Sequence, residues 1–106
     1  MPYLVRLADR ALRDMEAIYE FIHAESSETA FAWFNDLARE IHSLERFPER
    51  GAVTQESKKL RQLLFGKKPS TYRIIYALDK RKRLVSVLHI RHGARAPIST
   101  EEKRQL

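Results

Sequence analysis

The hydrophobic positions follow a helical spacing in the first half of the chain and a strand pattern in the second. The segment "PYLVRLA" (residues 2–8) predicts a short first strand. Asp9 is a candidate N-cap for the helix that follows, because its side chain can accept from the first free N–H groups. On one face of that helix, hydrophobic residues recur every three or four positions. They are Leu12, Met15, Ile18, Tyr19 and Ile22.

A second helix is predicted over residues 29–47, where "TAFAWFNDLAREIHSLERF" repeats the helical spacing. Ser26 or Ser27 can cap its first turn, and Pro48 ends it. The joint between the two helices is short, which predicts an antiparallel helical hairpin. The hydrophobic stripe of the second helix contains Ala30, Phe34, Leu37, Ile41 and Leu44, with Phe31 and Trp33 at its margins.

Beyond a polar loop, three segments rich in β-branched and aromatic residues predict strands. They are "LRQLLFG" (60–66), "TYRIIYAL" (71–78) and "LVSVLHIR" (84–91), and "DKRKR" joins the last two as a hairpin loop. The order is β-α-α-β-β-β, which predicts a single α+β domain over residues 1–106. In this fold an N-terminal strand precedes an antiparallel helical hairpin, which packs on one face of a small antiparallel β-sheet.

Charge is divided unevenly along the chain, which has a net charge of +6. Residues 1–53 carry ten acidic and six basic side chains, whereas residues 54–106 carry four acidic and fourteen basic ones. A basic half on a small domain favours a polyanion or an acidic partner protein. A solvated, lysine-rich surface would give the same composition.

The composition also bounds the compartment. The chain has no cysteine, so disulfides and thiolate metal sites are excluded. No stretch approaches the apolar length of a membrane span, and the N-terminus lacks the apolar region of a secretory signal. We therefore expect a cytoplasmic protein without a membrane partner.

Cations interrupt the hydrophobic pattern of the last two strands. If Leu78 faces Leu84 across the loop, then Arg73 faces His89. The opposite face would be nearly all apolar and is expected to carry the helices; it contains Tyr72, Ile74, Tyr76, Leu78, Leu84, Ser86, Leu88 and Ile90. The pattern predicts a cationic, anion-binding end on the face without helices. The alternative is a solvated sheet face on which each cation pairs with a carboxylate.

Several segments, taken in order, resemble the RelE/ParE superfamily of bacterial toxins from type II toxin–antitoxin modules. The segments are "LADRALRDMEAIYEFI", "LERFPERG", "LRQLLFG", "YRIIYAL" and "VLHIRHGAR". The resemblance covers residues 3–95 and implies a toxin of the plasmid-stabilisation type. It implies neutralisation by a cognate acidic antitoxin, and it implies no cofactor and no metal.

The resemblance leaves the activity open, because the superfamily has two. RelE-like members cleave mRNA in the ribosomal A site without a metal, which would make this chain an endoribonuclease acting with the ribosome and mRNA. ParE-like members block DNA gyrase, which requires binding but no bond chemistry. A third alternative is a non-catalytic nucleic-acid-binding domain, although the sequence has no recognition motif such as a helix-turn-helix.

For mRNA cleavage, the resemblance implies catalytic roles for Arg73, His89 and His92. Arg73 matches the arginine of the superfamily's "YR" strand, and a guanidinium fits phosphate oxygens. The two histidines lie near a segment that carries a catalytic histidine in some members, and imidazole suits proton transfer near neutral pH. The candidate contacts to RNA or another target are Lys58, Lys59, Arg61, Arg91 and Arg95.

Overall fold

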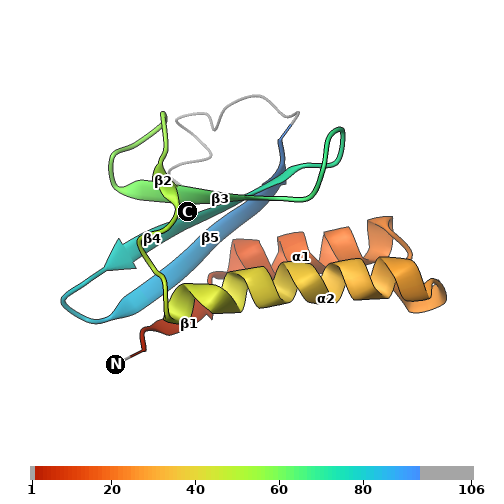
Figure 1. The fold of residues 1–106 in the computed structure, drawn as a ribbon, viewed down its shortest axis with the longest axis horizontal. Helices are drawn as coiled ribbons and strands as arrows, with labels where there is room; N and C mark the ends of the chain where they lie inside the picture. The colour runs from red at the N-terminus through yellow and green to blue at the C-terminus, as the bar shows by residue number, and fades with distance from the viewer. Residues whose placement is uncertain (1, 94–106) are drawn as a thin grey trace.

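The computed structural model describes residues 2–93, which form two layers. A helical hairpin lies against one face of a five-stranded sheet (Figure 1). The elements are β1 (Leu4–Leu7), α1 (Asp9–Phe21), α2 (Glu28–His42), β2 (Ala52–Val53), β3 (Leu60–Phe65), β4 (Tyr72–Asp79) and β5 (Leu84–His92), with short 3-10 turns at Ala24–Ser26 and Ser43–Glu45. The predicted α+β class and the order of the helices and long strands are confirmed.

The sheet has the strand order β1-β5-β4-β3-β2. Strand β1 pairs in parallel with β5, and the other neighbours are antiparallel. Two parallel strands need a crossover connection between them. Here the chain between β1 and β5 provides it, and that chain contains both helices and strands β2, β3 and β4. The sequence pattern predicted neither this parallel pairing nor the two-residue strand β2.

The ends of the helices differ partly from the prediction. Helix α1 begins at Asp9 itself, and the residue before it, Ala8, makes no side-chain cap. The predicted Asp9 cap is therefore wrong, although a carboxylate in the first turn still favours the helix dipole. Ser27 does cap α2, since its Oγ accepts from Ala30 N at 3.2 Å. Helix α2 ends at His42, before Pro48, and passes into a 3-10 turn.

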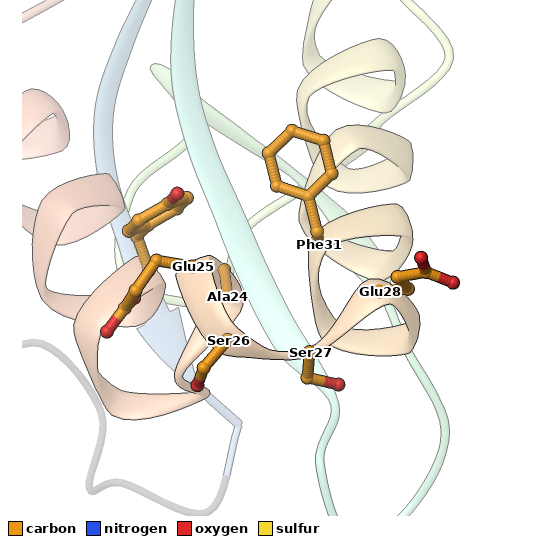
Figure 2. A pocket seen from close by; sticks show the side chains of 7 residues that line it. Ala24, Glu25, Ser26, Ser27, Glu28 and Phe31 are labelled. Carbon is orange, nitrogen blue, oxygen red and sulfur yellow. The ribbon is translucent and has the colours of Figure 1, made fainter.

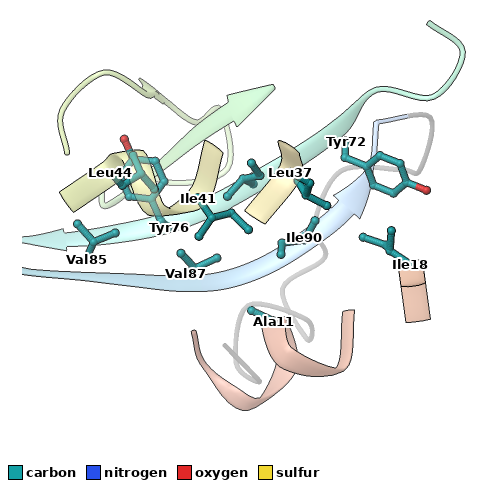
Figure 3. Packing of buried hydrophobic residues seen from close by; sticks show 11 residues of the cluster. Ala11, Ile18, Leu37, Ile41, Leu44, Tyr72, Tyr76, Val85, Val87 and Ile90 are labelled. Carbon is teal, nitrogen blue, oxygen red and sulfur yellow. The ribbon is translucent and has the colours of Figure 1, made fainter. Parts of the chain in front are cut away.

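The core lies between the helical hairpin and strands β4 and β5 (Figure 3). Its buried members are Ala11, Ile18, Leu37, Ile41, Leu44, Tyr72, Ile74, Tyr76, Val85, Val87 and Ile90. Leu12 was predicted in this core, but its side chain is 48% exposed. Helix α1 turns Ala11 toward β5 instead, and the small side chain lets the helix approach the strand closely.

Tyr76 ties the segment after α2 to the sheet. Its hydroxyl donates to the Pro48 carbonyl at 2.7 Å and accepts from Gly51 N at 3.0 Å. The side chain is fully buried, and this burial raises the pKa of Tyr76 above its ordinary value. The segment therefore reaches β2 along a fixed path. Within residues 2–93, no helix is long and apolar enough to cross a membrane.

Candidate functional site

The register of the β4–β5 hairpin differs from the prediction and decides the geometry of the candidate site. Asp79, rather than Leu78, faces Leu84 across a four-residue turn. A bulge then shifts the pairing, because Tyr76 faces Val87 whereas Ile75 faces His89. Each shift moves side chains of one strand relative to the other. Arg73 consequently faces Arg91, and the predicted pairing of Arg73 with His89 is wrong.

The same shift changes which residues of β5 face the helices. Val85 and Val87 belong to the helix-side core, in place of the predicted Leu84 and Ser86. Leu88 packs instead on the other face, beside Leu60 and Ile75. The residues of β4 were assigned correctly, since Tyr72, Ile74 and Tyr76 all pack against the helices.

Arg73 lies on the face without helices and is held by two side chains. Its Nη1 and Nη2 each donate to a carboxylate oxygen of Glu56 at 2.9 Å, and its Nε donates to Gln62 Oε1 at 2.7 Å. The Arg73 and Glu56 side chains are only 15% and 7% exposed. A bidentate pair of this kind uses the guanidinium fork that would otherwise bind a phosphate.

His89 turns toward helix α1 and is buried, with an exposed fraction of 1%. Its Nδ1 lies 2.5 Å from Asp14 Oδ2, and its Nε2 lies 3.5 Å from Arg10 Nη2. Asp14 also accepts from Ile90 N at 3.0 Å. Burial alone would raise the pKa of Asp14, but the hydrogen bonds from His89 and Ile90 outweigh it and lower that pKa.

The structure therefore places Arg73 and His89 in different surroundings. Arg73 contacts Glu56 and Gln62 on the face without helices, whereas His89 contacts α1. Both ring nitrogens of His89 face protein groups, so the imidazole is not placed to exchange a proton with a bound RNA. The predicted direct pairing of Arg73 with His89 is not formed, because Arg73 faces Arg91 and His89 faces Ile75.

The remaining candidates are scattered. His92 is half-buried and its ring meets Tyr72 edge to face at 5.2 Å. Arg91 is buried, with an exposed fraction of 3%. The Nη1 of Arg61 donates to the carbonyls of Glu49 and Gly51, so this side chain supports the chain before β2.

Lys58 and Lys59 are exposed, beside the start of β3. Arg95 lies outside the described residues. A mostly apolar hollow of about 470 Å³ opens beside Arg73, lined also by Leu64, Lys68, Pro69, Thr71 and Gly93. Two of its lining residues, Lys68 and Arg73, are cations, and none is acidic.

Sequence reasoning missed Asp14, Glu56 and Gln62, which hold the candidate residues in place. Asp14 could have been recognised, because it lies on the same face of α1 as the buried residues Ala11 and Ile18. A carboxylate on a buried face needs a partner. Glu56 gives no such signal, because it lies in a polar loop far from Arg73 in the sequence.

Comparison with protein families shows which class of protein has this fold. Residues 5–97 match the model of the ParE toxin of type II toxin–antitoxin systems, parDE. The chain therefore belongs to the ParE toxin family. A comparison with curated protein sequences gave no significant match.

Solved structures of related toxins share the fold. A chain of the chromosomal ParDE system from P. aeruginosa has a TM-score of 0.65 at 17% identity, covering 85% of this chain and 95% of that one. A free mutant of the E. coli toxin RelE has a TM-score of 0.66 at 16% identity, covering 100% and 99%. The RelBE2 toxin–antitoxin complex from Mycobacterium tuberculosis contains a chain with a TM-score of 0.54 at 26% identity, covering 87% and 99%. These relatives include toxins crystallised with their antitoxins.

Proposed function

We propose that this toxin arrests growth by binding DNA gyrase, in the cytoplasm, without cutting RNA. One observation supports the proposal: the side chains that RNA cleavage would need are each engaged by another protein group. Arg73 is engaged by Glu56, and His89 is buried against Asp14 on a different element. General acid–base catalysis requires a proton-transfer group within reach of the phosphate-binding group. Membership of the ParE toxin family supports the same choice.

The test uses purified toxin in a DNA gyrase supercoiling assay. We expect inhibition at micromolar toxin, and equal inhibition by the Arg73→Gln/Glu56→Gln variant, which keeps a neutral hydrogen-bonded pair. Full supercoiling activity in the presence of wild-type toxin would contradict the proposal. The matched control is Asp36→Asn, which changes an exposed ion pair with Arg39 on helix α2.

The second candidate function is cleavage of mRNA on the ribosome, and one observation favours it. Arg73 and Arg91 are direct partners across β4 and β5, so two arginines are neighbours on the sheet. A phosphate could bind there if Glu56 were displaced, with His92 as the remaining candidate for proton transfer. Lys58, Lys59 and Arg61 would then contact the RNA or the ribosome, as would Arg95. Mapping of mRNA ends after induction tests this candidate: new cuts that Arg73→Gln abolishes would support it.

We also propose a cognate acidic antitoxin as the partner that neutralises the toxin. The basic second half of the chain, with fourteen basic and four acidic side chains, supports an acidic partner. The hollow beside Arg73 is a candidate anchor point, because apolar walls there adjoin Lys68 and Arg73. We expect a sub-micromolar complex that weakens severalfold as salt rises. Titration calorimetry in low and high salt measures this, and an affinity independent of salt would mean that apolar contacts dominate.

A further inference from the structure

A groove between helices α1 and α2 lies outside the candidate site described above. It consists of two adjoining hollows, of about 360 and 470 Å³, that meet at Tyr19. The first runs along the helices beside Leu12, Met15 and Phe34. The second lies at the tip of the hairpin, between the end of α1 and the start of α2, beside Ala24 and Phe31 (Figure 2). We call the two hollows together the hairpin groove.

The floor of the hairpin groove is mostly apolar. The rings of Tyr19 and Phe34 meet edge to face at 5.1 Å across the two helices. Leu12 and Phe31 are 48% and 47% exposed, although each is a large hydrophobic side chain. Contiguous exposed apolar side chains on a small domain mark an interaction surface more often than single ones do.

The rim of the hairpin groove is acidic. Four exposed glutamates line it, and no cation does among its described lining residues; they are Glu16, Glu20, Glu25 and Glu28. None of the four forms an ion pair with another described residue. Figure 2 shows the carboxylates of Glu25 and Glu28 on either side of Phe31. Uncompensated charge of one sign favours a partner of the opposite sign.

We propose that the hairpin groove binds an amphipathic helix of the toxin's cellular target, with lysines or arginines flanking its apolar stripe. Along α1 the groove extends from Leu12 to Glu20, about 12 Å at 1.5 Å per residue, which accommodates about two helical turns. Apolar side chains spaced three and four apart would enter the groove, and cations on both sides would reach the glutamates. This inference rests on the proposed function, because it assumes a toxin that acts by binding a protein.

Charge distinguishes this occupant from two others. An acidic antitoxin would meet four carboxylates in the hairpin groove, whereas the basic second half of the chain suits it better. A second copy of this chain, docked groove to groove, would place two sets of these carboxylates against each other. Like charges facing each other across an interface are unfavourable, so both occupants are disfavoured relative to a basic helix.

Two variants and a control test the inference. Leu12→Ser/Phe31→Ser removes the apolar anchors, and Glu20→Lys/Glu25→Lys reverses part of the rim without touching buried side chains. The matched control is Phe21→Ser, because Phe21 is 77% exposed but lines a different hollow, beside Tyr72 and Ile90. Each protein is induced in bacteria at matched levels. Its melting temperature, its oligomeric state and its affinity for the cognate antitoxin proposed above are measured as well.

We expect both variants to need about tenfold more toxin for growth arrest, as loss of an interface hot spot would cause. Their antitoxin affinity should stay within about threefold of wild type, and Phe21→Ser should behave as wild type. Unchanged toxicity of both variants would overturn the inference. The inference would also be overturned if the variants lost antitoxin affinity as well while keeping their melting temperature, because the groove would then bind the antitoxin. It would be overturned too if wild type were a dimer and the variants were monomers, because the groove would then bind a second copy. Failure of wild-type toxin to inhibit gyrase would instead contradict the proposed function and leave the growth comparison valid.

Discussion

Asp14 Oδ2 lies 2.5 Å from His89 Nδ1, so a carboxylate of α1 holds an imidazole of β5. Strand β1 pairs with β5 only as far as Val87. Beyond that point the same edge of β5 is bound by Asp14, whose carboxylate also accepts from Ile90 N. Asp14→Ala leaves two buried donors without an acceptor. We expect the free energy of unfolding in urea to fall by about 2–3 kcal/mol. Asp36→Ala, in an exposed ion pair, should change it by less than about 0.5 kcal/mol.

The lowered pKa of Asp14 also predicts how stability depends on pH. Because the folded state favours the ionised carboxylate, Asp14 contributes stability at pH values above its unfolded pKa. That contribution is lost as the pH falls through the folded pKa, in the range below about pH 4. Urea unfolding between pH 2 and 6, about the range in which carboxyls titrate, should show a shallower decline for Asp14→Asn than for wild type. Parallel curves for the two proteins would contradict this account.

The Arg73–Glu56 pair should be strongly coupled, because both side chains are nearly buried. Removing either partner alone leaves a charge in a poorly hydrated place. We expect Arg73→Gln and Glu56→Gln each to destabilise the fold by about 2 kcal/mol, and the double variant by less than the sum. A double-mutant cycle in urea measures this coupling. Additive effects would mean that the two side chains act independently.

The hydroxyl of Tyr76 should contribute measurably to stability. Tyr76→Phe removes the donor to Pro48 and the acceptor for Gly51 N, so we expect a loss of about 1–2 kcal/mol in thermal or urea unfolding. Tyr19→Phe is the control, because it keeps the ring contact with Phe34 and should cost less than about 0.5 kcal/mol. Equal effects of the two substitutions would show that the buried hydrogen bonds add nothing.

Local patterns predicted the helices, the three long strands and the face of β4 that meets the helices, because each depends on spacing within one segment. The pairing of Arg73 with Arg91, in place of the predicted His89, could not be found in the same way. It depends on the length of the turn and on the bulge beside Leu88, and neither leaves a mark in the hydrophobic pattern. The partners Glu56 and Asp14 come from other elements, so they follow from tertiary packing rather than from sequence spacing.

Separate labelling of DNA and protein synthesis after induction tests the central claim most directly, because the two candidate targets act on different processes. A toxin that binds gyrase should depress thymidine incorporation first, while methionine incorporation continues at its initial rate. The Arg73→Gln/Glu56→Gln variant should give the same order. An immediate fall in methionine incorporation with DNA synthesis still intact would contradict the account and favour cleavage of mRNA.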